Sequence, residues 1–481
     1  MTNRHSARRP WSHPTGRGRR TFAALGGLVA LIGFSAGCGA RFSSQQHADL
    51  VDRYRVGRGT AAASAGSSPT GRAAESSPSN PSGSDAASGA GSANGVTGGE
   101  GNSSAAATGP LPCSAPSDAP GVSADTITVG SISTLSGPIP GLGESAANAA
   151  RAYVAYLNAN GGVCGRKVDL KTADDGDDNG TYRSVLSQME PSILGLIGED
   201  GAGDAGGVDV MTSKNIPAVT SAFSIPFKNA PTVFAINPPY ADTSQSSAKY
   251  RWLHDHGATK AALVYAAVAQ AQDQIKMVEQ PLMEAAGIQV VSDQALPLST
   301  LSYDPAARVV ANSGANYLLF LGAYEQNTNM ARSMAGAGYK GLKFSEYYTT
   351  YGTNFIDQAG DASEGVTSWS VALPVEDGGK NAEQAKYLQW LNQVAPGSAT
   401  DVFANSAWAS SKAFFDALQA LPGPISRDAL IAQVKTITSY DADGFLGRIN
   451  LGGKSNFGCY IGMQVVNGKW QRLVPSDGFL C

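Results

Sequence analysis

Apolar positions along residues 126–178 change their period twice, which predicts a strand, a helix and a second strand in that order. Thr126–Ser133 is an apolar, β-branched run of strand length. Over 144–158 the apolar residues recur every three or four positions, as on one face of a helix, and Gly161-Gly162 ends that helix. Alternation returns over 167–173. Such a unit builds a parallel sheet, in which ligands bind at the carboxyl ends of the strands.

The loop after the first strand, 134–138, reads Thr-Leu-Ser-Gly-Pro and lies at that end of the expected sheet. Ser136 and Gly137 have two interpretations here. Their hydroxyl and backbone groups contact a ligand, or they form a tight turn that leads into the helix. The local pattern favours neither interpretation.

The alternation of strand and helix continues to the C-terminus and restarts after Ile236, as if a second doubly wound lobe began there. We therefore predict an α/β protein with two Rossmann-like, doubly wound lobes. A turn at Asn467-Gly468 joins the last two strands in a hairpin. Strands are expected at 193–198, 217–221, 232–236, 260–266, 288–295, 317–322, 342–346, 364–371, 447–451, 460–466 and 470–474, and helices at 240–256, 270–286, 304–313, 327–338, 382–394, 402–421 and 426–435.

Composition divides the chain into a part that folds and a part that does not. Residues 39–112 are mostly Gly, Ala, Ser, Thr and Pro and cannot bury enough apolar surface to offset the entropy of ordering. We predict a disordered tether over 38–112 and a folded domain over 113–481, which is long enough for two lobes. A net charge of −4, without a basic patch that carries interleaved aromatics, gives no case for nucleic acid as a partner.

The N-terminus has the pattern of an export signal over residues 1–37. Six arginines precede an apolar core at 22–36, and the small residues Ser35-Ala36-Gly37 stand directly before Cys38. Small residues before a cysteine resemble a lipoprotein signal, in which Cys38 would carry lipid and anchor the chain to the cell membrane. Plain cleavage with secretion, or an uncleaved anchor, are the alternatives. All three place the folded part outside the cytoplasm.

Four further cysteines meet an oxidising space after export and allow three pairings. Cys113 precedes the first strand and Cys164 precedes the second. Because neighbouring parallel strands start side by side, we predict a Cys113–Cys164 disulfide. Cys459 and Cys481 flank the terminal hairpin, and we predict that they pair as well. No Cys-x-x-Cys is present, so the sequence gives no zinc site or thiol enzyme.

Other motifs in the chain do not support cofactor, metal or catalytic chemistry. Residues 175–180 match the first half of a calcium-binding loop, but Leu186 stands where the bidentate Glu belongs, so we interpret them as a surface turn. Gly137, Gly141 and Gly143 do not have the spacing of a dinucleotide-binding loop. No Ser, His and acid arrangement of hydrolase type is found, and we predict that the protein is not an enzyme.

Several segments, taken in order, resemble the leucine/isoleucine/valine-binding proteins, which are type I periplasmic binding proteins and the extracytoplasmic receptors of ABC importers. The resemblance implies two lobes joined by three hinge crossings, near 236–237, 373–374 and 449–450, with ligand captured in the cleft by closure. Lobe one would hold about 118–236 and 374–449, and lobe two about 237–373 and 450–481. The segments that carry it are the first strand with loop 134–138, then 160–167, 172–176, 216–219, 237–242, 360–365 and the hairpin residues 465–470.

The resemblance also implies a ligand site between strand-end loops. In the family, the loops that correspond to 199–204 and 220–224 hold the carboxylate of an amino acid ligand. Here Ala222 would offer its carbonyl to an ammonium group, and Ser224 its hydroxyl and amide. The ligand-binding residues implied are Asp200, Ser221, Ala222, Phe223 and Ser224 on the first lobe, with Gln270, Tyr324, Glu346 and Tyr348 on the second.

Acidic residues in the first of these loops depart from the family pattern. Glu199, Asp200 and Asp204 stand where serines are expected, and acidic side chains facing the ligand would repel a carboxylate. A cationic, amide or sugar-like solute therefore stays as plausible as an amino acid.

These patterns predict a solute-binding protein that passes a small polar molecule to the membrane permease of an ABC importer. A ligand-sensing receptor of the same fold, which signals to a membrane partner, is the alternative. The long tether fits either role, and the sequence does not discriminate between them.

Overall fold

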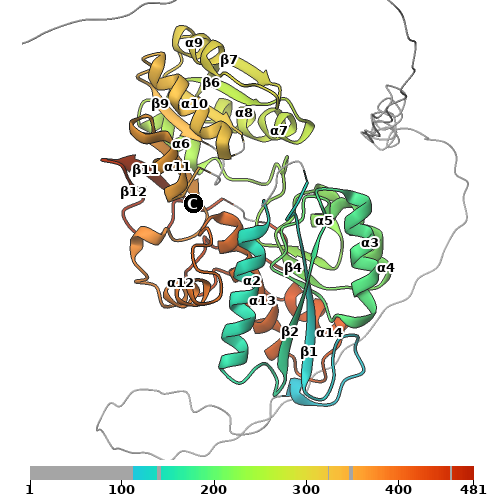
Figure 1. Ribbon diagram of the computed structural model, residues 1–481. Helices are drawn as coiled ribbons and strands as arrows, with labels where there is room; N and C mark the ends of the chain where they lie inside the picture. The colour runs from blue at the N-terminus through green and yellow to red at the C-terminus, as the bar shows by residue number, and fades with distance from the viewer. Residues whose placement is uncertain (1–111, 138–141, 323, 346–349, 456–457) are drawn as a thin grey trace, which may run out of the picture. The chain divides into compact units, whose positions relative to one another are not determined.

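The fold contains two separate β-sheets with helices on both faces of each (Figure 1). The computed structural model describes residues 112–137, 142–322, 324–345, 350–455 and 458–481. The expected signal peptide, the tether and Cys38 lie outside the described residues. Within the described ranges, no helix is both long enough and apolar enough to cross a membrane.

The first sheet has five strands in the order β2-β1-β3-β4-β5, and every pair is parallel. The opening strand–helix–strand prediction is confirmed, with β1 and β2 in register along their whole length. We call this sheet and the helices packed on it the first lobe. Its strands are β1 (Thr126–Ser133), β2 (Lys167–Asp174), β3 (Leu196–Ile197), β4 (Ala218–Thr220) and β5 (Val233–Ala235), and its helices are α2 (Glu144–Ala159), α3 (Asn179–Met189), α4 (Val208–Ser213), α5 (Ile225–Asn229), α12 (Ala382–Val394), α13 (Val402–Gln419) and α14 (Arg427–Lys435).

Alternate residues of the first sheet enter two different cores. Ile197 and Val219 pack with α2 and α13, whereas their neighbours Leu196 and Ala218 pack with α3, α4 and α5. A strand buried on both faces presents apolar side chains to each, which explains the uninterrupted apolar runs in the sequence.

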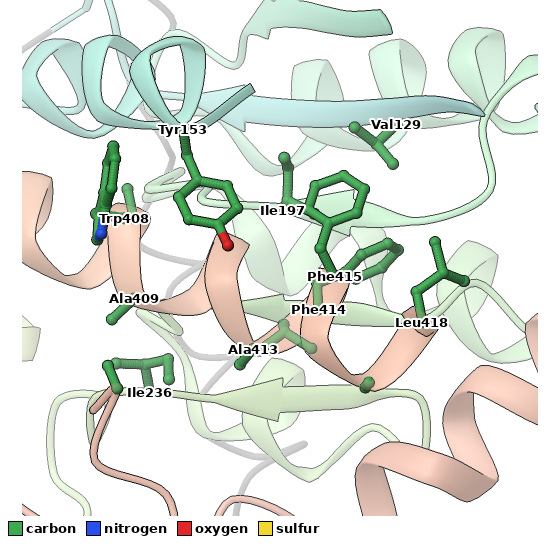
Figure 2. Packing of buried hydrophobic residues seen from close by; sticks show 14 of the residues in the cluster. Val129, Tyr153, Ile197, Ile236, Trp408, Ala409, Ala413, Phe414, Phe415 and Leu418 are labelled. Carbon is green, nitrogen blue, oxygen red and sulfur yellow. The ribbon is translucent and has the colours of Figure 1, made fainter. Parts of the chain in front are cut away.

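The core under α2 and α13 is rich in aromatic side chains from both helices (Figure 2). The ring of Tyr153 lies edge-on to Trp408 at 4.8 Å and stacks on Phe415 at 6.2 Å. Phe414 contacts Phe415 edge-on. Tyr153 belongs to α2, whereas Trp408, Phe414 and Phe415 belong to α13. These contacts therefore pack α13, which comes late in the sequence, against the opening strand–helix–strand unit.

The second sheet has seven strands in the order β12-β11-β10-β9-β8-β6-β7, and the hairpin strands β11 and β12 are its antiparallel members. We call this sheet and its helices the second lobe. The Asn467-Gly468 turn has positive φ at both residues, as a two-residue hairpin turn requires. The strands are β6 (Lys260–Ala266), β7 (Gln289–Leu296), β8 (Tyr317–Leu321), β9 (Leu342–Ser345), β10 (Val366–Ser370), β11 (Ile461–Val466) and β12 (Lys469–Val474), and the helices are α6 (Ala248–Asp255), α7 (Ala269–Gln274), α8 (Gln280–Ala285), α9 (Asp304–Asn312), α10 (Tyr324–Gly336) and α11 (Thr353–Ala359).

The chain passes between the two sheets three times. It leaves the first sheet after β5, returns after β10 to form α12, α13 and α14, and leaves again before β11. Arg427 of α14 holds the returning segment on the first lobe. Its buried guanidinium donates to the carbonyls of Glu190, Ile193, Leu194 and Lys214 and to the Glu190 carboxylate.

Two predicted secondary-structure elements differ from those in the structure. The helix expected over 240–256 begins only at Ala248, because Ala241 has φ +60° and the segment before it contains two prolines. The strand expected over 447–451 makes only single bridges, Ile449 with Tyr440 and Asn450 with Ser455, and so joins no sheet.

Other helices were missed or are interrupted. Helix α3 buries only Tyr182 and Leu186, too few apolar positions for a clear period, and α4, α5 and α11 are shorter still. The helix expected over 270–286 is broken into α7 and α8 by a π-helical turn, Ile275–Glu279. Pro281 lies in the first turn of α8 and has no N–H to donate to the preceding turn.

The calcium-loop match at 175–180 contains a turn at 176–177, as expected, and its last two residues begin α3. Asp178 caps the helix by accepting a hydrogen bond from the Thr181 amide at 2.7 Å. Leu186 is fully buried in the core, where a calcium-binding Glu could not reach solvent.

Both predicted disulfides, Cys113–Cys164 and Cys459–Cys481, are present. The first joins the segment before β1 to the segment before β2, as expected from parallel neighbours. It closes the longer loop, with a sequence separation of 51 against 22 for the second.

The disulfides should stabilise the fold mainly by restricting the unfolded chain. Cys113→Ser/Cys164→Ser and Cys459→Ser/Cys481→Ser should each lower the free energy of unfolding by about 2–4 kcal/mol, more for the longer loop. Urea unfolding of both double variants measures this. Treatment of the parent chain with a reductant serves as the control and should lower its stability at least as far. Unchanged stability in both variants would contradict the expectation.

Candidate functional site

The loops that follow β1, β2 and β3 are joined by hydrogen bonds at the carboxyl end of the first sheet. Thr134, directly after β1, donates from its hydroxyl to Asp175 at 2.7 Å and accepts from the Ala202 amide at 2.8 Å. The Thr134 amide donates to the carbonyl of Asp200 at 3.0 Å. The second Asp175 oxygen accepts from the Gly203 amide at 2.8 Å. These bonds fix the strand ends where a ligand is expected in an open α/β sheet.

Gly203 allows this close approach because it has no Cβ. A Cβ there would lie 2.6 Å from the carbonyl oxygen of Asp178. Any larger residue would push the third loop away from the second.

Asp204 is buried and holds the loop that follows β4. Its Oδ2 accepts from the Phe223 amide at 2.7 Å and from the Ser224 amide at 3.2 Å. Burial raises the pKa of Asp204 to about 7, although the hydrogen bonds from Ser224 and Phe223 act in the opposite direction. The two amides that could bind an anion are therefore already taken by a side chain of the protein.

Glu199 is also turned inward. Both of its carboxyl oxygens accept from the Tyr182 hydroxyl, at 2.9 and 3.0 Å. Burial raises the pKa of Glu199 well above its usual range, and the Tyr182 hydrogen bond only partly offsets this.

Asp200 and Ser221 differ from these residues because their side chains have no hydrogen-bond partner among the described residues. Asp200 follows β3 and is 1% exposed, and Ser221 follows β4 and is 7% exposed. The two strands are direct neighbours in the sheet. Burial raises the pKa of Asp200 well above its usual range, and the negative charge of Asp401 raises it further. A buried polar group without a partner costs about 1–3 kcal/mol, so two at adjacent strand ends mark a place where a ligand can repay that cost.

Three aromatic rings lie next to these loops. Phe223 stacks on Tyr240 at 6.2 Å between ring centroids and on Phe403 at 6.3 Å. Phe223 and Tyr240 are both half-buried, so parts of their surfaces stay open. Phe403 lies in the first turn of α13, two residues after the capping residue Asp401.

Other predicted site residues have structural partners. The Ser136 hydroxyl donates to Asp174, and a Cβ on Gly137 would lie 2.4 Å from the carbonyl oxygen of Gly176, so this loop forms the tight turn. The Ser224 hydroxyl caps α5 by accepting from the Phe227 amide. Ala222 is buried. Whether any of them contacts a ligand stays a prediction.

The structure describes two of the four site residues that were expected from the second lobe. Gln270 is exposed on α7. Tyr324 is the first residue of α10. Glu346 and Tyr348 lie outside the described residues. Their role as ligand contacts stays a prediction.

Sequence reasoning missed four residues at this site: Asp175, Tyr240, Asp401 and Phe403. Asp175 was visible as one of the acidic residues directly after a strand. Tyr240 was noted only as part of segment 237–242. Asp401 and Phe403 had no local signal, because they reach the first sheet only through the returning helix α13.

The described residues contain no group of three or more His, Cys, Asp or Glu side chains placed to hold a metal ion. The ionisable side chains at the strand ends are acidic, and their chemistry is that of hydrogen-bond acceptors and cation partners.

Comparison with known proteins gives the family. A model of the periplasmic binding protein family matches residues 126–469, and the chain belongs to this family. It is a type I member, of the kind that includes the branched-chain amino acid-binding proteins. No curated protein sequence matches.

Known structures share the fold at low sequence identity. A fatty acid ABC transporter substrate-binding protein from Thermomonospora curvata is 17% identical, with a TM-score of 0.62 over 74% of this chain and 93% of that one. The branched-chain amino acid transporter substrate-binding protein LivJ from Streptococcus pneumoniae, in complex with isoleucine, is 16% identical, with a TM-score of 0.60 over 73% and 100%. The leucine-binding protein LivK from Thermotoga maritima is 14% identical, with a TM-score of 0.60 over 72% and 98%.

The raised pKa of Asp204 should make stability depend on pH. The folded state keeps a proton on this group up to about pH 7, whereas the unfolded chain releases it near the ordinary value of 3.8. The free energy of unfolding should therefore fall as pH rises from 4 to 7. Asp204→Asn keeps an acceptor for the amides but does not titrate, so its curve should be less steep by about 1 kcal/mol per pH unit.

Urea unfolding at a series of pH values between 4 and 8 measures both curves. Glu199 and Asp200 titrate in both proteins, so their contributions cancel in the difference. Parallel curves would show that Asp204 is ionised in the folded state at all these pH values.

Proposed function

We propose that this protein is the extracytoplasmic solute-binding component of an ABC importer and that it captures a small polar solute between its two lobes. Membership in the periplasmic binding protein family supports the general role. The observation that carries the proposal is the pair of buried, unpartnered side chains, Asp200 and Ser221, at the ends of neighbouring strands.

The position of this pair agrees with the rule for open parallel sheets. Ligands of such sheets bind outside the carboxyl ends of the strands, where the loops diverge. Asp200 and Ser221 offer oxygen acceptors there, and Ser221 also offers a hydroxyl donor. The hydrogen bonds of Thr134 and Asp175 hold the surrounding loops fixed, which lowers the entropic cost of binding.

The proposed mechanism is capture by closure. The solute binds first to the strand-end loops of the first lobe, and rotation about the three crossings brings the second lobe over it. The domain limits in this proposal are those expected from the sequence, with hinges near 236–237, 373–374 and 449–450. Lipid on Cys38 and the tether that follows would hold the domain near its membrane permease.

A hydroxyl that serves a solute should be dispensable for folding. Ser221→Ala should weaken solute binding about three- to tenfold, the effect of one hydrogen bond, while stability stays the same or rises slightly. Isothermal titration calorimetry gives the binding change, and urea unfolding gives the stability.

Thr232→Val is the matched control for this substitution. Thr232 also has a buried hydroxyl without a partner, but it lies before β5, at the amino end of the strands. Thr232→Val should leave solute affinity unchanged. Equal losses of affinity in Thr232→Val and Ser221→Ala would contradict the position assigned to the site.

The function itself is tested by a thermal-shift screen of the purified chain against amino acids, amides, amines, polyamines, sugars, nucleosides and fatty acids. A solute that binds only the folded state must raise the melting temperature once its concentration exceeds the dissociation constant. We expect at least one class to do so. No shift with any class would contradict a solute-binding role.

A further inference from the structure

We propose that the solute carries a cationic, amine-type group, which Asp200 and the aromatic rings of Phe223, Tyr240 and Phe403 recognise on the first lobe. This inference rests on the proposed function and specifies the chemical class of the solute. It differs from recognition of a carboxylate by loop amides, which the resemblance implied.

The first argument is an unbalanced group of buried acids. Asp175, Glu199, Asp200 and Asp204 are each at most 1% exposed. They occupy the loops after β2 and β3, and none of them forms an ion pair with another residue that the structure describes. The charged groups that shift the pKa of Glu199, Asp200 and Asp204 are all acidic. An arriving cation would be the missing partner for this group.

Three basic side chains that contact the first lobe have other partners. Lys228 of α5 forms a buried ion pair with Asp242. Lys454 donates to the carbonyls of Lys228 and Ala230. Arg427 is engaged with the carbonyls at the amino end of β3. Each of these three basic side chains therefore has hydrogen-bond or ion-pair partners other than the four buried acids.

The second argument is that the anion route is closed. Asp204 already accepts from the amides of Phe223 and Ser224, so its carboxylate lies where a ligand carboxylate would bind. The Ser224 hydroxyl accepts from the Phe227 amide as a helix cap. A solute carboxylate would have to displace a buried side chain and would then lie among the other buried acidic groups, Asp175, Glu199 and Asp200.

The third argument is the aromatic rings beside the acids. A cation is attracted to the faces of aromatic rings, and the attraction grows when water is excluded. Phe223 stacks between Tyr240 and Phe403, and its amide donates to Asp204, which lies in the same loop as Asp200. The rings and the unpartnered carboxyl therefore belong to one region of the first lobe.

The Asp200 oxygens are covered in the structure, so a cation gains access only when neighbouring loops shift. Asp200 would then accept a hydrogen bond from the solute nitrogen. The Ser221 hydroxyl, at the end of β4, would accept a second hydrogen bond from the same nitrogen. Both oxygens of Asp200 lack partners beforehand, so no existing hydrogen bond of that side chain must break.

The test compares three probes that share a branched alkyl body: isoamylamine, isoamyl alcohol and isovalerate. Polyamines, basic amino acids and quaternary ammonium compounds extend the cationic set, and leucine combines both charges. We expect thermal shifts with members of the cationic set and none with isovalerate. Binding of isovalerate, or of the alcohol as tightly as the amine, would overturn the proposal.

Asp200→Asn tests the residue directly. Asparagine has a similar shape but no charge, so binding of the best cationic probe should weaken at least tenfold by calorimetry. Asp209→Asn is the control, since Asp209 is an exposed carboxylate on α4 of the same lobe, paired with Arg183. It should leave the affinity unchanged. An equal loss of affinity in Asp200→Asn and Asp209→Asn would show only a general effect of protein charge. That result would overturn the assignment of Asp200 as the cation-binding residue.

Asp204→Ala tests the closed anion route, with Asp204→Ser as a second small variant if the alanine protein is unstable and Asp204→Asn as the matched control. Removal of the carboxylate frees the amides of Phe223 and Ser224, so acetate or isovalerate should raise the melting temperature of the alanine variant and not that of the parent. Asp204→Asn, which still fills the position, should gain no anion binding. Anion binding by the parent chain would contradict the inference.

Failure of this inference can be told from failure of the proposed function. If a neutral or anionic solute from the wider screen binds and Asp200→Asn has no effect, the protein is a solute-binding protein but the cationic class is wrong. If no solute of any class binds, the proposed function falls and the inference falls with it.

Discussion

The candidate site depends on the carboxylate of Asp175, which ties together the loops after three parallel strands. Thr134 donates to one of its oxygens, the Asp177 amide to the same oxygen, and the Gly203 amide to the other. Because these donors occupy Asp175 fully, it serves as a scaffold rather than as a solute contact. One of these loops contains Asp200, and Asp204 of the same loop holds the loop after β4 that contains Ser221.

Four acids in one small region therefore have different roles, and the difference lies in their hydrogen bonds. Asp175 joins loops, Glu199 accepts from Tyr182, and Asp204 holds the amides after β4. Of these four acids, Asp200 alone has both carboxyl oxygens without a hydrogen-bond partner among the residues that the structure describes. The sequence suggests that the acidic loop 199–204 would repel a carboxylate. In the fold, Glu199 and Asp204 instead form hydrogen bonds within the protein, and Asp200 does not.

The fold and the solute are determined by different parts of the chain. Structures with 14–17% identity share the fold, and their names refer to ligands as different as fatty acids and branched-chain amino acids. The sheets and their cores tolerate such divergence as long as apolar periods are kept. In our proposal the solute is selected by a few strand-end side chains, whose identity the fold does not constrain.

The sequence by itself determined the two-lobed α/β fold, the opening βαβ unit, the hairpin and both disulfides. These depend on local periods, on turn residues such as Asn467-Gly468, and on the rule that parallel neighbours begin side by side. The resemblance to a known family also named Asp200 and Ser221 as ligand contacts, which stays a prediction. Nothing in the sequence indicated that the hydrogen bonds of Asp204 differ from those of Asp200. Only the tertiary structure decided that Asp204 turns inward to the amides after β4, and that α13 brings Phe403 to the same edge, because the contact of Phe403 with Phe223 joins segments 180 residues apart in the chain.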